Sequence, residues 1–404
     1  MIQAILKSPI YPKIIYIEEE RIQIALGANE RKYPRSLLMV NEFIEKLKKK
    51  YERPFQIFGV LPFDFSVEGT IWEGLPPSIM VLPQWQFEWD NGKVTIKWAE
   101  NETEAHMMMD KLLRETVVEI GDSKSEEKLH FQDIPMEEDW KRLVTEAIED
   151  IKANKYQKIV LARAKSSTIP KGKQIDLAKT FLSLHENYPK CLTFLISLDK
   201  EHTFFGSTPE TLGKKEGEVF QTMALAGTVP VSEGEQQARN LLLGTKKLTD
   251  EHKIVVESIV EQLKKVSKQQ TISQPEILRL KNVFHLHTPI RSILKSDIPW
   301  YELIKVLHPT PAVGGRPRDI AISKIRSMEK WSRGWYTGLL GWVDHQGDFD
   351  LRVALRCALI NHDIIWVFAG AGIVDGSEPV SEWEETESKF QPVLNSLVLT
   401  EVEK

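Results

Sequence analysis

Residues 334–374 read GWYTGLLGWVDHQGDFDLRVALRCALINHDIIWVFAGAGIV and contain three apolar runs, at 334–343, 350–360 and 363–374. Asp, Gly, His and Asn residues separate the runs, and such breaks between short apolar runs are typical of β-strands. No helical stretch lies between one run and the next. Hairpin connections are therefore favoured over the helical crossovers that parallel strands need. This stretch predicts neighbouring antiparallel strands.

The rest of the chain combines the same strand pattern with a few helices. The segments that predict strands are KIIYIEEE (13–20), QIFGVLPF (56–63), KVTIKWAE (93–100), KIVLARAK (158–165), CLTFLISL (191–198) and HTFFGST (202–208). Apolar residues at helical spacing predict helices at 137–151, 176–188, 248–266 and 379–391. Strands outnumber the helices that could serve as crossovers, which indicates an α+β fold.

The sequence changes character near residue 135, where short strand-like segments give way to longer elements. No Pro/Gly/Ser-rich linker separates the two parts, and domain boundaries usually fall in such linkers. We therefore expect residues 1–135 to form the N-terminal part of the same fold as residues 136–398. The chain is predicted to be one structural domain.

Composition excludes several classes of function. The 404 residues are 42% hydrophobic and 27% charged, as in ordinary globular proteins. The net charge is −5 and the basic residues are spread along the chain, so we expect no nucleic-acid partner. Ile364–Val374 is the longest apolar run and is far shorter than the roughly 20 residues of a membrane span. It is interpreted as a buried strand that runs into a turn.

Cysteine usage and the first residues bear on location. Cys191 and Cys357 are too few for a disulfide framework, which fits a reducing, cytoplasmic setting. The opening MIQAILKSPIYPK has no apolar core followed by a small-residue cleavage site, so we expect no signal peptide. The protein is expected to be soluble.

The helix predicted at 248–266 carries an acid on its apolar face. Glu251 shares a stripe with Ile254, Val255 and Ile259. A buried carboxylate needs a cation or hydrogen-bond donors, because burial of a bare charge is very costly. The spacing leaves two interpretations open: a functional buried acid, or an acid that the helix N-terminus favours.

The last predicted helix carries two acids and a lysine on one face. Glu382, Glu385 and Lys389 stand at positions i, i+3 and i+7. Two carboxylates on one turn could hold a hard divalent cation through oxygen. A surface acid cluster with an i, i+4 ion pair explains the same spacing. No H-x-x-x-H pair occurs, which argues against a zinc hydrolase.

Two glycine-containing segments, ALAGT with Gly227 and the run Gly370-Ala371-Gly372, predict tight turns. Each turn could also bind an anion through backbone N–H groups. His285 and His287 lie two residues apart on an extended segment. They are expected to pack or to form hydrogen bonds, and contact of one with a ligand stays open.

Three further charged residues have both an ordinary and a functional interpretation. Lys158 begins an apolar strand, where it either reaches the solvent at the edge or is desolvated and available as a neutral base. Glu210 follows Pro209 after a strand and is either a solvated turn acid or a proton donor. Arg356 is interpreted as an interior strand arginine that needs an anionic partner if it is buried.

Taken together, nine segments resemble the chorismate-binding catalytic region shared by isochorismate, salicylate, anthranilate and aminodeoxychorismate synthases. They are KIVLARAK, FFGSTPETL, ALAGT, DEHKIVVE, HLHT, LHPTPAVGGRP, RGWYTGLLGW, LRVALRCA and FAGAGIV with EWEETESK. They occur in the family's order and spacing between about residues 137 and 397. The resemblance implies a core of large, mostly antiparallel sheets with helices packed outside.

The resemblance also implies a role for each candidate residue. It implies that Mg²⁺ is bound by Glu251 and Glu385, with Glu382 close to the metal and acting through water. The positions that match substrate-binding residues are Gly227, His285, Ala312, Tyr336, Arg356, Gly372 and Lys389. Lys158 matches the lysine that activates water in isochorismate and salicylate synthases, whereas the amine-using enzymes carry glutamine there. Glu210 is expected to donate a proton to the departing C4 hydroxyl.

The family offers two products for a lysine-containing site. The segment HPTPA (308–312) resembles isochorismate synthases, whereas salicylate synthases tend to place hydroxyl residues after the proline. We therefore expect an isomerase that converts chorismate to isochorismate for menaquinone or siderophore biosynthesis. Salicylate synthase, which also eliminates pyruvate, is the alternative. A cytoplasmic monomer with no amidotransferase subunit, no nucleic acid and no membrane partner is expected.

Overall fold

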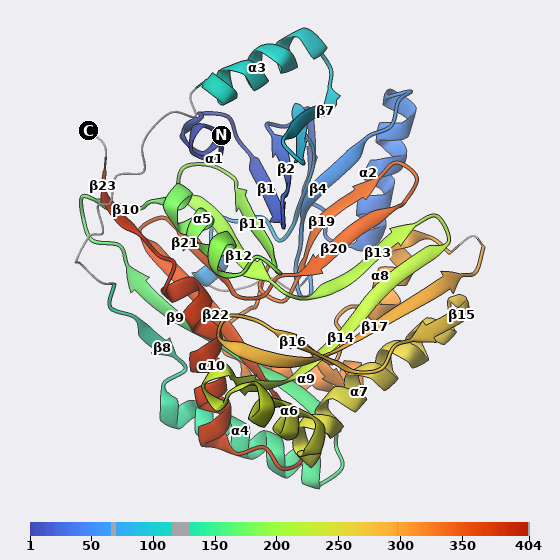
Figure 1. Ribbon diagram of the computed structural model, residues 1–404, viewed down its shortest axis with the longest axis vertical. Coiled ribbons are helices and arrows are strands. Elements are labelled where there is room, and N and C mark those ends of the chain that lie inside the picture. The colour runs from blue at the N-terminus through green and yellow to red at the C-terminus, as the bar shows by residue number, and fades with distance from the viewer. Residues whose placement is uncertain (66–69, 115–128, 297, 403–404) are drawn as a thin grey trace.

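The computed structural model describes residues 1–65, 70–114, 129–296 and 298–402, and two large sheets organise them (Figure 1). The first sheet has the order β18-β9-β22-β21-β12-β11-β1-β2-β6-β7, with β8 paired to β9, and every strand pair in it is antiparallel. Its strands are β1 (Lys13–Glu18), β2 (Arg21–Leu26), β6 (Trp85–Asp90), β7 (Lys93–Ala99), β8 (Gln132–Ile134), β9 (Lys158–Thr168), β11 (Leu192–Ser197), β12 (His202–Thr208), β18 (Gly315–Arg316), β21 (Cys357–Asn361) and β22 (Ile364–Ile373).

The second sheet has the order β15-β17-β14-β13-β20-β19-β4-β5-β3, with β16 paired to β17. Its strands are β3 (Glu30–Lys32), β4 (Gln56–Leu61), β5 (Ile79–Leu82), β13 (Thr211–Glu216), β14 (Val219–Pro230), β15 (Ser267–Ile272), β16 (Glu276–Arg279), β17 (Val283–Leu294), β19 (Leu339–Asp344) and β20 (Phe349–Val353). A separate two-stranded antiparallel sheet pairs β10 (Lys173–Ile175) with β23 (Leu399–Glu401). The predicted antiparallel pattern is confirmed.

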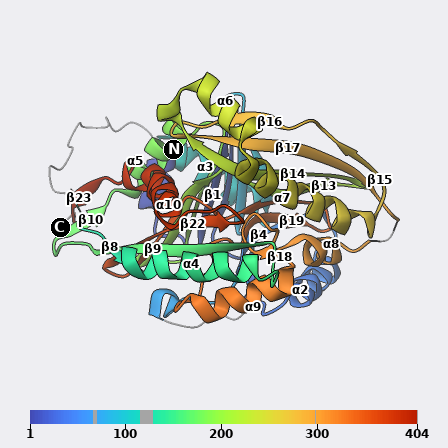
Figure 2. The ribbon, with the colours of Figure 1, turned by 90° about the horizontal axis from the view of Figure 1, so that it is seen from below.

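The helices lie outside the two sheets. They are α1 (Ile2–Lys7), α2 (Leu37–Lys50), α3 (Glu102–Arg114), α4 (Glu137–Lys152), α5 (Leu177–Asn187), α6 (Glu235–Gly244), α7 (Lys246–Lys264), α8 (Trp300–Leu307), α9 (Arg318–Met328) and α10 (Pro379–Leu394), with 3₁₀ turns at Thr70–Trp72 and Val231–Glu233. In Figures 1 and 2, α10 and α4 lie beside β22 and β9, whereas α7 runs along the second sheet. The helices predicted at 137–151, 176–188, 248–266 and 379–391 correspond to α4, α5, α7 and α10.

Apolar packing explains this layering. Side chains from both sheets fill the space between them, including Tyr16, Phe58, Phe194, Phe204, Leu340 and Leu359. On the outer side of the second sheet, α2, α7 and α8 bury their apolar faces in another cluster. Helices α5 and α10 do the same on the first sheet. An α+β fold with helices packed outside its sheets is therefore confirmed.

Residues 1–135 contribute strands to both sheets. In the first sheet, β1 is hydrogen-bonded to β11 on one side and to β2 on the other. In the second sheet, β4 pairs with β19. Neither sheet is built from one part of the chain alone, and this interleaving supports the prediction of one structural domain. Among the described residues, no helix is long and apolar enough to cross a membrane.

Within residues 334–374 the structure differs from the predicted strands. Residues 334–338 form a turn, and the strand starts at Leu339. The run 350–360 is split between β20 of the second sheet and β21 of the first, so Arg356 is not inside a strand. It has a φ of +48°, which places it in the left-handed region at the crossing between sheets.

The predicted turn at Gly370–Gly372 is also wrong. The strand β22 continues to Ile373, and Gly370, Ala371 and Gly372 pair with residues 162, 161 and 160 of β9. Gly227 does have a φ of +79°, but it forms a bulge within β14 rather than a chain reversal. A bulge bends the strand and leaves one residue outside the regular ladder.

Candidate active site

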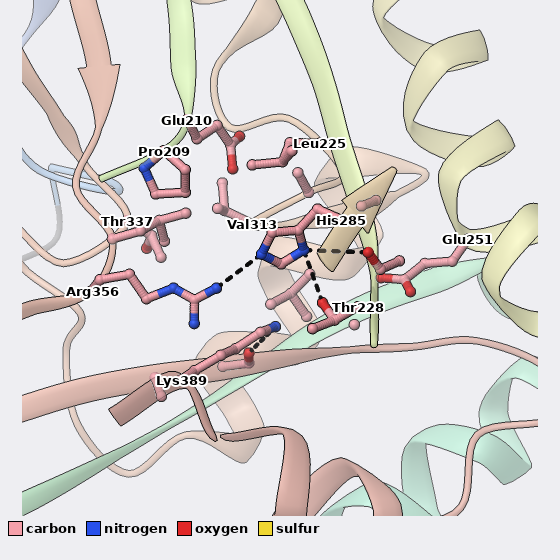
Figure 3. Close-up of a pocket in the computed structure, with 18 of the residues that line it drawn as sticks. Pro209, Glu210, Leu225, Thr228, Glu251, His285, Val313, Thr337, Arg356 and Lys389 are labelled. Carbon is pink, nitrogen blue, oxygen red and sulfur yellow. Dashed lines mark hydrogen bonds between the residues drawn. The ribbon is translucent and has the colours of Figure 1, made fainter. Parts of the chain in front are cut away.

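A cavity of about 650 Å³, which includes its open mouth, lies where the ends of β9, β14, β17 and β22 approach α7 and α10 (Figure 3). All the predicted site residues except Glu382 and Glu385 line it: Lys158, Glu210, Gly227, Glu251, His285, Ala312, Tyr336, Arg356, Gly372 and Lys389. The first and the last of these residues, Lys158 and Lys389, stand more than 230 positions apart in the chain. Folding therefore gathers the predicted set around one space.

Lys158 and Glu251 form a buried ion pair in the cavity wall. Lys158 is the first residue of β9 and is 1% exposed. Its Nζ donates to Glu251 Oε1 at 2.9 Å. Glu251 lies on the buried face of α7, as its spacing indicated. The lysine therefore does not reach solvent at the strand edge, and the acid has a partner beyond the helix N-terminus.

Gly372 provides the space for this pair. A methyl group added at Gly372 would overlap the Glu251 carboxylate and come within 2.9 Å of Lys158 Cε. Gly372 pairs with Val160 in the ladder between β22 and β9, so the backbone has little freedom to retreat. The glycine acts through its missing side chain rather than through a turn of backbone N–H groups.

Glu210 is buried between the two sheets. It follows Pro209 in the connection from β12 to β13 and is 4% exposed. Burial raises the pKa of Glu210 to about 7, against the lowering influence of Lys158, Lys389 and Arg356. The interpretation as a solvated turn acid is wrong. A carboxyl group that is protonated near neutral pH can act as a proton donor.

His285 and Arg356 are hydrogen-bonded to each other on another wall of the cavity. Arg356 Nη2 lies 3.2 Å from His285 Nε2, and His285 Nδ1 lies 3.2 Å from both Gly227 O and Thr228 Oγ1 (Figure 3). Burial lowers the pKa of His285 to about 3, so the imidazole is neutral. Its Nδ1–H can then donate to Gly227 O while Nε2 accepts from Arg356. His287 lines a different groove.

The Arg356 guanidinium keeps one donor free. Within the described part of the chain, the buried Nη1 of Arg356 has no hydrogen-bond partner. An unsatisfied buried donor on a cation is costly, and an anionic ligand in the cavity would satisfy it. The left-handed backbone of Arg356 is itself unusual for a residue other than glycine and is a feature often found at functional sites.

Glu382 and Glu385 lie beside the cavity on α10. Glu385 accepts from Lys389 Nζ at 2.6 Å, and Glu382 accepts from Lys247 Nζ at 2.5 Å. Burial, followed by the negative charge of Glu385, raises the pKa of Glu382 to about 7. Glu382 Oε2 has no partner among the described residues. Two electrostatically coupled acids with one unsatisfied oxygen fit the oxygen donors that Mg²⁺ prefers.

A lysine side chain lies next to each of the three acids that were predicted to bind or approach the metal. Glu251, Glu382 and Glu385 each contact a different lysine. In the part of the chain that the structure describes, no group of three or more His, Cys, Asp or Glu side chains is arranged around a common metal position. The donor set suits a hard cation in chemistry, and a cation would have to displace lysine contacts.

Several residues around the cavity were missed by the sequence interpretation. Lys247 could have been found, because it stands four positions before Glu251 on the same helix. Thr310 lowers the pKa of Glu210, and Phe368 stacks on the predicted Tyr336 with ring centroids 5.2 Å apart. These contacts join segments far apart in sequence, so local spacing carries no signal of them.

The arrangement has defined chemical capacities. Arg356 and Lys389 give the cavity positive charge, which suits a small anionic ligand. Glu210 can give a proton, and Lys158 can take one if its ion pair opens. A base and an acid of this kind in one buried space fit a substitution in which one hydroxyl enters and another leaves.

Comparison with known proteins finds isochorismate synthases among those similar to this chain. The isochorismate synthase MenF of Bacillus subtilis is 36% identical over 268 residues, which cover 64% of this chain and 55% of that protein, so the match spans just over half of its length. MenF of Haemophilus influenzae is 34% identical over 94% of this chain and 85% of its own. A crystal structure described as putative 2,3-dihydroxybenzoate-specific isochorismate synthase DhbC of Bacillus anthracis superposes with a TM-score of 0.78 at 25% identity, covering 98% of each chain.

The sequence profile of the family described as chorismate binding enzyme matches residues 29–398. This range includes the second sheet, the first sheet apart from β1 and β2, and every residue of the cavity described above. The match therefore rests on most of the chain, and it agrees with the fold and with the relatives. The chain belongs to the chorismate-binding enzyme family.

Proposed function

We propose that this protein is an isochorismate synthase, which adds water at C2 of chorismate and releases the C4 hydroxyl. The observation that carries the proposal is the presence of Lys158 and the protonated Glu210 in one buried cavity. A lysine at this position favours water over an amine as the nucleophile. Relatives named isochorismate synthase, with 34–36% identity, support the same activity.

The two catalytic residues have complementary roles. Lys158, as the neutral amine, removes a proton from water while the oxygen forms a bond to C2. The electrons of both conjugated ring double bonds shift, the C4–O bond breaks, and Glu210 gives its proton to the departing hydroxyl. One water is consumed and one is released, so the reaction is an isomerisation with no redox cofactor.

The remaining cavity residues bind and orient the substrate. Chorismate carries two carboxylates, and Arg356 with Lys389 supplies positive charge for them. His285 is neutral and fixed by Gly227, so it holds Arg356 in place without adding a charge. Tyr336 and Ala312 shape the wall of the cavity. We propose Gly227 and Gly372 as further substrate-contacting positions.

We also propose that Glu251 and Glu385 bind Mg²⁺, with Glu382 acting through water. The unsatisfied Glu382 Oε2 and the mutual influence of Glu382 and Glu385 support this assignment. When bound, the cation would offset the charge of the ring carboxylate and compete with Lys158 for Glu251. Without the cation, Lys247 and Lys389 balance the charges of Glu382 and Glu385.

Product analysis tests the proposed function. The purified protein is incubated with chorismate and Mg²⁺, and the products are separated by chromatography. Isochorismate as the accumulating product is expected. Stoichiometric salicylate and pyruvate would favour the salicylate synthase alternative, and no consumption of chorismate would exclude both activities. Omission of Mg²⁺ with added chelator should stop the reaction.

Pathway, assembly and location are further parts of the proposal. Two similar solved structures are described as a menaquinone-specific and a putative 2,3-dihydroxybenzoate-specific isochorismate synthase, so isochorismate could feed either route. We propose a cytoplasmic monomer that needs no amidotransferase subunit, because water replaces ammonia. The free, buried Cys191 and Cys357 suit a reducing compartment. Light scattering on the purified protein measures the assembly state directly.

A further inference from the structure

Strand β9, which carries Lys158, lacks a continuous neighbouring strand on one of its edges. Strand β9 pairs with β22 along most of its length. On its other edge, β18 lies opposite residues 158 and 159, and β8 lies opposite residues 164–166. Residues 160–163 fall between these two short strands. Those of their buried backbone N–H and C=O groups that face this edge, away from β22, need other partners.

A buried ion pair supplies two of these partners. Ala162 N donates to Glu329 Oε1 at 2.8 Å, and Arg333 Nη2 donates to Val160 O at 2.7 Å. Arg333 also donates from Nε to Glu329 Oε2 at 2.8 Å, and both side chains are at most 2% exposed. The pair thus occupies the place of the missing strand next to Lys158.

The same arginine reaches a second wall of the cavity. Its Nη1 donates to Val313 O at 2.7 Å, and its backbone C=O accepts from Tyr336 N at 2.9 Å. Val160, Val313 and Tyr336 all line the cavity. The guanidinium itself therefore connects two distant segments, at Val160 and Val313, to the segment 329–336 that carries it.

The contacts continue from Val313 to the proton donor. Val313 N and Gly314 N donate to Thr310 O at 3.1 Å and 2.8 Å, and the Thr310 side chain lies near enough to Glu210 to lower the pKa of its carboxyl group. Val160 N donates to Gly314 O at 2.7 Å. The strand that carries Lys158 and the 310–314 loop are thus joined directly, at Val160 and Gly314, and a second time through Arg333.

An ordinary stabilising role does not account for the choice of residues. A buried ion pair can often be replaced by apolar side chains without loss of stability. Here an apolar pair would leave the C=O groups of Val160 and Val313 and the N–H of Ala162 unsatisfied. The directional donors of a guanidinium and the acceptor of a carboxylate are what these three positions require.

We propose that Glu329 and Arg333 are positioning residues that replace a strand beside β9 and fix the separation of Lys158 and Glu210. This inference rests on the proposed function for its catalytic meaning. Neither side chain lines the cavity, so neither contacts the substrate. Their effect passes through Val160 on one side and through the 310–314 loop on the other.

Glu329→Gln tests the inference, with Asp350→Asn as its matched control. Asp350 also forms a carboxylate–arginine pair, with Arg352 Nε at 2.7 Å, but this pair is partly buried and lies in the second sheet, outside the cavity. Hydrogen–deuterium exchange should be at least tenfold faster in segments 158–163 and 310–316 of Glu329→Gln than in wild type. Asp350→Asn should leave both segments unchanged.

Steady-state kinetics with chorismate then separates positioning from stability. Glu329→Gln should lower kcat at least tenfold with KM within threefold of wild type, whereas Asp350→Asn should change neither. Arg333→Lys, which keeps the charge but has fewer donors, should give the same pattern and serves if Glu329→Gln does not fold. Unchanged exchange, or faster exchange without a loss of kcat, would overturn the inference. If wild type consumes no chorismate, the proposed function fails while the exchange comparison still decides whether the pair replaces a strand.

Discussion

Lys158 Nζ lies 2.9 Å from Glu251 Oε1, although 93 positions separate the two residues in the chain. Each charge would be very costly to bury alone, and each has the other as its partner. The contact joins the first residue of β9 to the buried face of α7 at the cavity wall. It fixes the base of the proposed reaction and a proposed metal ligand relative to each other.

Replacement of Lys158 tests its role as the base. Lys158→Ala should lower kcat by about 10³-fold, because general base catalysis contributes typically 10²–10⁴-fold. Chorismate binding, measured by calorimetry, should change little. Lys155→Ala is the control, since Lys155 is exposed and lies just before the same strand. Wild-type turnover by Lys158→Ala would remove the base assignment.

The pH dependence of kcat/KM should report Glu210. The pKa of Glu210 is raised to about 7 by burial, and the proposed donor must be protonated. Activity should therefore fall about tenfold per pH unit above pH 7. Glu210→Gln should be slower by 10²-fold or more and should lose this alkaline decline. An unaltered alkaline limb in Glu210→Gln would assign the decline to another group.

Glu210 should also make stability depend on pH. Its folded-state pKa of about 7 exceeds the ordinary value of 4.5, so the folded protein binds more protons than the unfolded chain between these pH values. The free energy of unfolding should thus fall as pH rises from 4.5 to 7, by about 3 kcal/mol in total. Urea unfolding of wild type and Glu210→Gln at pH 5 and pH 8 measures this difference. Equal pH dependence in the two proteins would argue against a buried, neutral Glu210.

The sequence predicted four of the helices and part of the strands, and the family resemblance named most of the residues that line the cavity. Strong amphipathic periodicity placed α4 and α7, and alternation with turn residues placed the antiparallel strands. Glu251 shows why a site residue could be found locally. It stands on an apolar stripe where a charge is costly, so the position itself signals a partner.

Other features depended on contacts that no local pattern records. Arg356 stands in an apolar run, yet the chain leaves one sheet and enters the other at that residue. Gly370 and Gly372 resemble turn residues, but the ladder with β9 continues through them. The pKa of Glu210 depends on its burial and on charges that are 50 to 180 positions away, such as those of Lys158 and Lys389.

The proposed metal ligands can be tested on α10 alone. Glu385→Gln should raise the Mg²⁺ concentration for half-maximal activity at least tenfold, because it removes a charged oxygen ligand. Glu384→Gln is the matched control, since Glu384 is the exposed neighbour on the same helix. Calorimetric titration with Mg²⁺ gives a readout independent of turnover. An unchanged titration in Glu385→Gln would exclude this residue from the ligand set.

Gly372→Ala tests whether a missing side chain makes room for the Lys158–Glu251 pair. The added methyl group would overlap the Glu251 carboxylate, and overpacking of this kind costs typically 1–3 kcal/mol. The paired backbone of β22 and β9 prevents an easy shift, so the ion pair should be displaced instead. Gly244→Ala is the control, because a methyl group there meets nothing within 4 Å.

Activity and stability should respond differently to these two glycine substitutions. Gly372→Ala should lose most of kcat even when it is assayed well below its unfolding temperature, since both the base and a proposed ligand move. Gly244→Ala should retain wild-type kcat and stability, as the methyl group contacts nothing. If Gly372→Ala keeps both kcat and the Mg²⁺ requirement of wild type, the pair tolerates displacement. The 2.9 Å contact between Lys158 and Glu251 would then not be needed for turnover.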